Sequence, residues 1–141
     1  MIIVLLLILR MMLLPSPVSH ACLQTVPGGT PSPGACCGPV PLVNTQSNFP
    51  DGIATFQYNS DTCRTTAVAT CSVSDPSIPL LAGIIGNRVE WLDYAATTVS
   101  VNFQCQQGAT GVQWTYTVQG QTLFLDTMEC VLTNPSQAPG G

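Results

Sequence analysis

Seven cysteines constrain the fold of this 141-residue chain more than any other feature of its sequence. None of them has the Cys-x-x-Cys spacing typical of zinc sites, and the only histidine, His20, precedes all seven. In a secreted chain, cysteines spaced in this way indicate disulfides rather than metal ligands. We therefore expect a fold stapled by disulfides that holds neither a metal nor another cofactor. The cysteines are Cys22, Cys36, Cys37, Cys63, Cys71, Cys105 and Cys130.

The first 21 residues are typical of a secretory signal peptide. Residues 2–14 are almost all apolar, and Ser19 and Ala21 are small residues at the two positions that signal peptidase reads. The run contains Arg10 and is shorter than the ~20 apolar residues of a membrane-spanning helix. A bacterial lipoprotein signal is the weaker alternative, because it needs an aliphatic residue where Ser19 stands. Cleavage after Ala21 predicts a secreted, extracellular product with no membrane attachment.

The charge that remains after cleavage excludes several kinds of function. Arg64 and Arg88 stand against seven acidic residues, a formal net charge of −5, and no lysine or histidine is left. Catalytic triads that use histidine and nucleophilic lysines are therefore excluded. An acidic chain is also a poor partner for nucleic acid. We expect no enzyme activity, with a carboxylate-dependent hydrolase as the alternative that remains chemically open.

Short runs of Val, Ile, Thr, Tyr and Phe alternate with turn residues after residue 36, a pattern typical of antiparallel β-structure. The pattern predicts an all-β, disulfide-stapled, antiparallel sandwich-like domain of about seven short strands. The first run contains two prolines and is expected only at an edge, and the last two form a hairpin around Gln119-Gly120. The runs are 39–43, 53–59, 63–73, 83–85, 88–92, 97–105, 112–118 and 122–132.

Composition divides the chain into four parts. Residues 1–21 form the signal peptide, residues 22–35 a Pro-, Gly- and Thr-rich arm, residues 36–132 the six-cysteine β domain, and residues 133–141 a flexible tail.

Strand geometry excludes some disulfides. Cys63 and Cys71 lie eight residues apart in one predicted strand, which separates them by about 26 Å at ~3.3 Å per residue. Cys36 and Cys37 are adjacent, and a bridge between them would be too strained. These two pairings are therefore not expected.

The remaining cysteines can be ranked but not assigned. Cys105 and Cys130 end the strands that flank the predicted strand 112–118, so these two are expected to be able to meet. One member of the adjacent pair would then face Cys63 or Cys71. Six cysteines allow fifteen connectivities, and the sequence leaves the choice open.

The cysteine order and the segments around it resemble the nematode six-cysteine (C-six) extracellular domain. The resemblance covers about Cys36 to Cys130 and includes the single Trp between the last two cysteines. It implies an extracellular location and this architecture, but no molecular activity. The segments that carry it are CCGPVPLV, PDGIATFQY, DTCRTTAVATC, ATTVSVNFQC and VQWTYTVQGQTLFLDTMEC.

The resemblance also implies one pairing. The first and third cysteines of the family bridge, which here are Cys36 or Cys37 and Cys63; in the family the first two cysteines are spaced apart, whereas here they touch. Cys71, Cys105 and Cys130 match the last three of the family's cysteines. The other member of the adjacent pair would bridge to Cys71 or to a C-terminal partner.

Cys22 lies before the domain. It is expected to be a free or intermolecular thiol, able to form a disulfide-linked dimer.

The two tryptophans of the chain have different expected roles. Trp114 alternates with apolar residues at every second position and is expected in the core. Trp91, with Glu90 and Asp93 beside it, is the candidate binding surface, for an extracellular protein or a glycan. We expect a secreted module with a binding or structural role at a surface or in a matrix. The alternatives are the small carboxylate hydrolase and a secreted defence or toxin-like effector.

Overall fold

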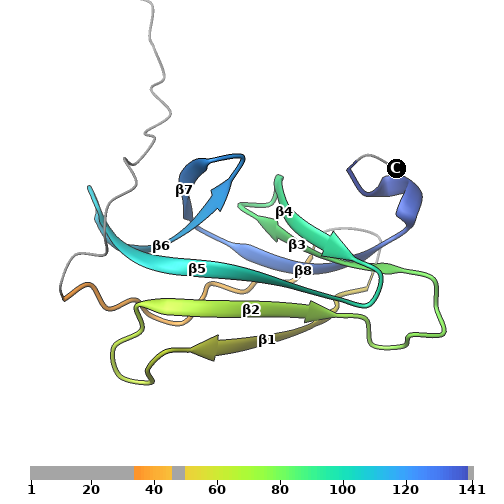
Figure 1. Cartoon of the computed structure of the whole chain (residues 1–141), viewed down its shortest axis with the longest axis horizontal. Helices are drawn as coiled ribbons and strands as arrows, with labels where there is room; N and C mark the ends of the chain where they lie inside the picture. The colour runs from red at the N-terminus through yellow and green to blue at the C-terminus, as the bar shows by residue number, and fades with distance from the viewer. Residues whose placement is uncertain (1–33, 46–49, 140–141) are drawn as a thin grey trace, which may run out of the picture.

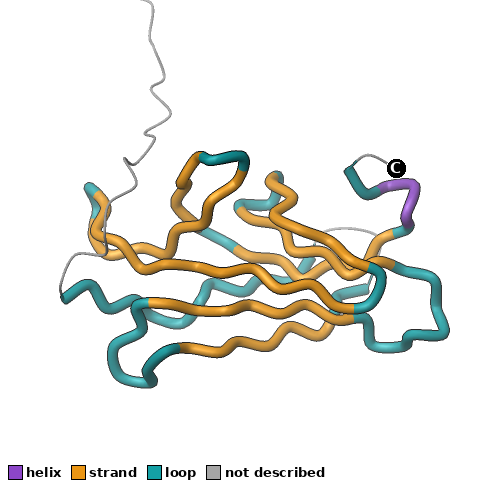
Figure 2. The backbone as a smooth tube through the Cα atoms, in the orientation of Figure 1, coloured by secondary structure: helices purple, strands orange, loops and turns teal. Residues whose placement is uncertain are grey.

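Two antiparallel β-sheets pack against each other in the computed structural model, which describes residues 34–45 and 50–139 (Figure 1). The larger sheet has the strand order β1-β2-β5-β6-β7 and the smaller one β4-β3-β8. A 3-10 turn at Pro135–Gln137 is the one helical element of the described residues (Figure 2). The strands are β1 (Ile53–Tyr58), β2 (Thr66–Ser72), β3 (Leu81–Gly86), β4 (Glu90–Ala95), β5 (Thr98–Gly108), β6 (Gly111–Val118), β7 (Gln121–Leu125) and β8 (Met128–Thr133).

The predicted all-β, disulfide-stapled sandwich is confirmed, with eight strands instead of about seven. The alternation that predicted the strands also orients them. In β5, Val99, Phe103 and Cys105 are buried between the sheets, and the residues that alternate with them are mostly exposed. Trp114 is buried in the core, as predicted, and its Nε1 donates a hydrogen bond to the Gly38 carbonyl at 2.9 Å.

No charged residue lies in any of the five strands of the larger sheet. All described charges lie in the smaller sheet or in the connections. The outward face of the larger sheet carries hydroxyl and amide groups, and Thr70 Oγ1 and Ser100 Oγ lie 2.8 Å apart across β2 and β5. The charged groups thus lie in β4 and β8 of the smaller sheet and in loops of both sheets, and none lies within a strand of the larger sheet.

The largest departure from the predicted strands lies near the C-terminus. Residues 122–132 do not form one strand, because the chain leaves the larger sheet at Leu125 and enters the smaller sheet at Met128. Asp126 and Thr127, which we call the β7–β8 link, make the crossing (Figure 1). The sequence does not show this break, because the residues on both sides of the link are hydrophobic. They are hydrophobic because β7 packs in the larger sheet and β8 packs in the smaller one.

Two smaller predictions were also wrong. Residues 39–43 form no strand, because Pro39 and Pro41 lack the N–H groups of a ladder; Leu42 alone makes a bridge, to Met128. The predicted strand 88–92 begins at Glu90 instead, because Asn87 and Arg88 have left-handed φ angles of 52° and 65° and form the turn between β3 and β4.

The segment before β1 closes one end of the core. Ala35, Cys37 and Val40 are buried, although none of them belongs to a strand. Cys37 N donates to the Arg64 carbonyl at 3.0 Å, and Val40 N donates to the Tyr58 hydroxyl at 3.0 Å. Hydrogen bonds to the ends of the larger sheet thus hold this segment over the core.

Three disulfides connect the six cysteines of the described residues. One lies between the segment before β1 and the β1–β2 connection, one between that segment and β5, and one between the two sheets. The pairs are Cys36–Cys63, Cys37–Cys105 and Cys71–Cys130.

The Cys36–Cys63 bridge is one of the two pairings, Cys36 or Cys37 with Cys63, that the C-six resemblance left open. The expectation that Cys105 and Cys130 could form a disulfide was wrong. It assumed that residues 122–132 form one strand beside strand 112–118, and they do not. After the β7–β8 link, Cys130 lies on β8 in the smaller sheet and faces Cys71 on β2 across the core.

The predicted signal peptide and Cys22 lie outside the described residues. Within these residues, no helix is long and apolar enough to cross a membrane.

Candidate functional site

The predicted binding residues all lie on β4, at an edge of the smaller sheet, but not on one face. The pairing of β3 with β4 shifts between Ile84 and Ile85, so that Ile84 opposes Asp93 and Ile85 opposes Trp91. This bulge places Asp93 on the face opposite to Trp91, since residues directly across a ladder share a face. The predicted surface of Trp91, Glu90 and Asp93 is therefore divided between the two faces.

Trp91 covers the outer face of the smaller sheet. Its ring lies over Gly83, and its centroid is 6.2 Å from that of Tyr94 in an edge-to-face arrangement. Glu129, on the same face, is buried at 5% exposure, and its Oε1 lies 3.7 Å from Arg88 Nη1. Trp91 is half-buried here, so it packs on the sheet more than it presents a free ring.

Replacing Gly83 by alanine should displace the Trp91 ring. A Cβ at residue 83 would overlap the six-membered ring of that indole. We expect a loss of about 2 kcal/mol in the free energy of unfolding and a red shift of tryptophan fluorescence. Gly38→Ala is the matched control, since its Cβ meets no atom within 4 Å. Equal effects of the two substitutions on emission and stability would contradict this packing.

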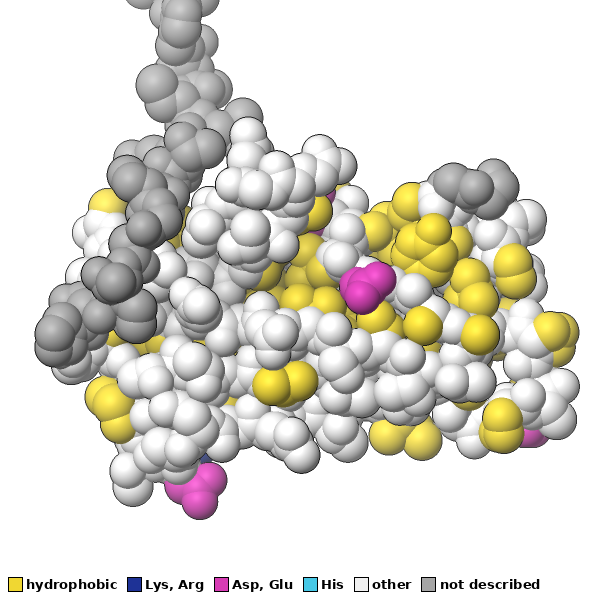
Figure 3. All heavy atoms as spheres, viewed as in Figure 1, with side chains coloured by type: hydrophobic (Ala, Val, Ile, Leu, Met, Phe, Trp, Pro, Cys, Tyr) yellow, Lys and Arg dark blue, Asp and Glu magenta, His cyan; other side chains and the backbone are white. Residues whose placement is uncertain are grey.

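Glu90 and Asp93 instead face the layer between the sheets. Glu90 opposes Gly86, and a Cβ at Gly86 would lie 3.3 Å from Tyr116 Cζ on β6. Figure 3 shows hydrophobic side chains at the bottom of a hollow between the β6–β7 hairpin and β4, with an acidic side chain at its rim. The acids of β4 thus border the region where the two sheets are open to solvent.

A separation of β5 from β6 forms the floor of this region. The two strands pair only from Gln104–Thr115 to Gly108–Gly111, and beyond Gln104 they diverge (Figure 1). We call this opening the β5–β6 wedge. Its lining residues have side chains on both the inner and the outer face of the larger sheet, so the opening runs through the sheet between β5 and β6. It encloses about 290 Å³ and is lined by Val101, Asn102, Gln104, Thr115, Tyr116, Thr117 and Thr122.

The direction of the β5 backbone groups follows from two hydrogen bonds at the ends of its ladder with β2. Cys105 N donates to the Thr65 carbonyl at 2.8 Å, and Val73 N donates to the Thr97 carbonyl at 2.9 Å. Odd-numbered residues of β5 therefore direct their N–H and C=O groups to β2. Because these groups alternate between the two edges of a strand, even-numbered residues direct theirs to the other edge.

Part of that other edge has no strand partner within the described residues. Gln104 uses its groups to pair with Thr115 of β6, but Ser100 and Asn102 face the wedge. By the same alternation, Thr117 directs its backbone groups into the wedge from the β6 side. The wedge thus contains an open strand edge, which is unusual in the middle of a sheet.

The Tyr116 hydroxyl is buried and lies within the electrostatic influence of two carboxylates. Burial raises the pKa of Tyr116, and the negative charges of Glu90 and Asp126 raise this pKa further. A hydrogen bond from Asn87 acts in the opposite direction. Glu90, Asp93 and Asp126 are all exposed. One end of the wedge therefore combines an aromatic hydroxyl with negative potential.

Asn87 holds this end of the site together. Its Oδ1 accepts hydrogen bonds from Asp126 N at 2.7 Å and Thr127 N at 3.3 Å, and its Nδ2 donates to the Phe124 carbonyl at 2.9 Å. The Tyr116 hydroxyl lies 3.4 Å from the same Nδ2. Asn87 was missed as a site residue, although Asn after Gly in the run IIGNRV is a turn signal.

The ionisation of Tyr116 tests this arrangement. Its raised pKa means that the unfolded chain loses this proton first, near pH ~10. The stability that the neutral hydroxyl contributes is therefore complete below that pH and decreases as pH rises toward the folded pKa. We expect the double substitution of Glu90→Gln and Asp126→Asn to lower the pKa of Tyr116. Tyrosinate absorbance measures this pKa, and the signal that is lost in Tyr116→Phe identifies the contribution of Tyr116. An unchanged pKa would place both acids away from the hydroxyl.

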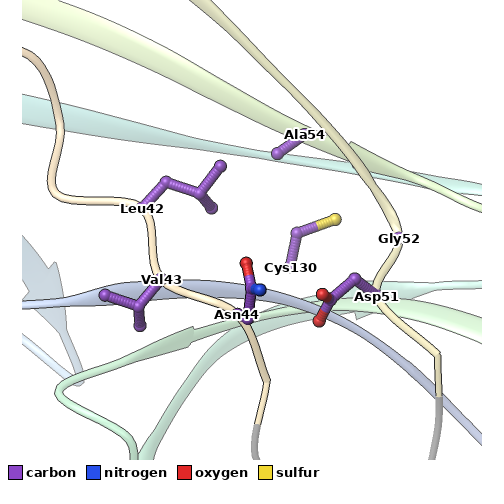
Figure 4. Close-up of a pocket in the computed structure, with 7 residues that line it drawn as sticks. All are labelled: Leu42, Val43, Asn44, Asp51, Gly52, Ala54 and Cys130. Atoms are coloured by element: carbon purple, nitrogen blue, oxygen red, sulfur yellow. The ribbon is translucent and has the colours of Figure 1, made fainter.

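The described residues also line further cavities, among them two on other parts of the molecule. One, of about 200 Å³, adjoins the disulfide between the sheets and has Asn44 and Asp51 as its polar side chains (Figure 4). The other, of about 340 Å³, is apolar. The first is lined by Leu42, Val43, Asn44, Asp51, Gly52, Ala54 and Cys130, and the second by Pro76, Ile78, Pro79, Leu80, Leu81, Ala96, Thr97 and Pro135.

No group of three or more His, Cys, Asp or Glu residues in the described parts of the chain is arranged to hold a metal ion. Comparisons of the chain with protein-family models, with curated proteins and with solved structures find no match.

Proposed function

We propose that this chain is a secreted extracellular module that acts by binding, and that it is a C-six-like domain. The observation that carries the proposal is that all six cysteines of the described residues form disulfides, with Cys71, Cys105 and Cys130 almost completely buried. Such bridges form and persist in oxidising compartments. The apolar leader of residues 2–14 supports the same location.

Binding is supported by the β5–β6 wedge and its rim. An open strand edge, a cavity of about 290 Å³ and exposed carboxylates occur at one place on the molecule. Features of this kind recognise a partner through hydrogen bonds and charge without any catalytic group. A structural role at a surface or in a matrix is compatible with the same features.

A second candidate is a carboxylate-dependent hydrolase, favoured by one observation. Glu90 opposes Gly86, which packs against Tyr116. Asn87 bonds both Asp126 N and the Tyr116 hydroxyl, so two acidic residues lie near one end of the wedge. Hydrolysis of chromogenic aryl glycosides by the purified chain, lost in Glu90→Gln and in Asp126→Asn, would support this candidate over binding alone. We expect no turnover.

Expression of the full-length chain in secreting cells tests the proposed location. We expect the product in the medium, beginning at Cys22 and resistant to thiol alkylation at the six domain cysteines. The control is the chain from residue 22 made in a reducing cytosol, which should fail to fold. A full-length chain that stays inside the cell with its leader intact would contradict the proposal.

A further inference from the structure

We propose that the β5–β6 wedge accepts an extended peptide strand that carries a lysine or arginine side chain. The strand pairs with the open edge of β5, and its cation lies at the end bordered by Glu90 and Asp126. This inference rests on the proposed binding function and names the class of partner.

The backbone of the wedge is suited to a strand more than to other ligands. Ser100 and Asn102 each offer one N–H and one C=O at the open edge, and these four groups repeat at the spacing of an antiparallel ladder. Thr117 offers two more from the opposite side. An added strand forms main-chain hydrogen bonds with such an edge and gains specificity from side chains at alternate positions.

The divergence of the two strands gives the added strand room. β5 and β6 are adjacent at Gln104 and Thr115, where their own ladder ends, and the cavity begins beyond this pair. A docked strand would therefore pair at Ser100 and Asn102 and stop short of Gln104. Its inward side chains would meet Val101 and Tyr116, which line the cavity from the core side.

Charge selects the basic side chain. The five strands of the larger sheet carry no charge, so the acids of the rim set the potential of the wedge. The one ion pair of the described residues joins Arg88 to Glu129 on the outer face of the smaller sheet, and leaves Glu90 and Asp126 without a basic partner. Burial raises the pKa of Tyr116, and the negative charges of Glu90 and Asp126 raise this pKa further, in the direction that this potential requires.

The chain's own arm is a poor occupant. Residues 22–35 contain no basic residue, and their three prolines lack the N–H groups that a ladder requires. A partner from another extracellular protein is therefore the occupant to test.

Amide chemical shifts of the secreted, isotope-labelled chain provide the test. The probe is the acetylated and amidated peptide Thr-Val-Lys-Val-Thr-Val. We expect shifts at the Ser100, Asn102 and Thr117 amides, and about fivefold weaker binding when the probe's lysine is replaced by glutamate. Glu90→Gln with Asp126→Asn should weaken binding to the lysine probe by a similar factor, whereas Asp61→Asn in the β1–β2 turn should not.

Two methylated probes test strand pairing itself. Methylation of alternate backbone nitrogens removes the donors from one edge of the peptide only. The set that removes the donors to Ser100 and Asn102 should therefore abolish binding, and the other set, which faces only Thr117, should weaken it much less.

Equal binding of both methylated probes, or no shift at millimolar peptide, would overturn the proposal. Shifts of the same amides by cellohexaose, in the absence of peptide binding, would overturn it in favour of a glycan. Neither result would affect the proposed secretion and disulfide pairing, which the medium and its mass spectrum report separately.

Discussion

Replacing Cys71 and Cys130 together by alanine is expected to lower the free energy of unfolding by about 4 kcal/mol. The bridge closes a separation of 59 residues and joins β2 of one sheet to β8 of the other. Restricting a loop of this length in the unfolded chain contributes most of that energy. Folded domains retain only ~5–15 kcal/mol, so the loss should lower the melting temperature by about 15 °C or more.

Urea denaturation followed by circular dichroism measures this loss. Cys22→Ser is the matched control, because it removes a cysteine that belongs to none of the three bridges of the described residues. We expect the control to unfold as the unmodified chain does. A double variant as stable as the control would mean that the bridge does not join the sheets in the folded protein.

Asn87→Ala should have the second largest effect, about 3 kcal/mol. The substitution removes the side chain that bonds Asp126 N, Thr127 N and the Phe124 carbonyl, and these three bonds together contribute about 2 kcal/mol. It also places alanine at a φ of 52°, a conformation that alanine disfavours.

Asn87→Gly separates these two causes. Glycine accepts the left-handed φ but makes none of the side-chain bonds, so we expect a loss of about 2 kcal/mol. The measurement is again urea denaturation. If Asn87→Ala cost less than about 0.5 kcal/mol, the β7–β8 link would be held by other contacts.

The sequence predicted features that depend on neighbours along the chain. Alternation in residues 97–105 correctly placed Phe103 inside and its flanking residues outside. The hairpin at Gln119-Gly120 was also correct, and both residues have the left-handed φ angles, 50° and 79°, of a tight turn. Such features are local because a two-residue period or a turn preference involves only a few adjacent residues.

Features that depend on which layer a segment joins were missed. Nothing in the run LFLDTMEC indicates that Leu125 and Met128 pack in different sheets, because both are apolar and the break carries only ordinary turn residues. The partner of Cys130 was wrong for that reason.

The candidate site depends on the same long-range arrangement. Trp91, Glu90 and Asp93 lie within four consecutive positions, but one bulge opposite Ile84 and Ile85 places Trp91 and Asp93 on opposite faces. The wedge was not predicted, since it is formed by the divergence of two strands that are each ordinary in sequence.

Peptide mapping of the secreted chain under non-reducing conditions tests the central claim most directly. The claim is that this chain is an extracellular sandwich whose two sheets are stapled by a defined set of bridges. Mass spectrometry should find an N-terminus at Cys22 and the linked pairs Cys36–Cys63, Cys37–Cys105 and Cys71–Cys130. A peptide that links Cys105 to Cys130, or free thiols among these six cysteines, would contradict it.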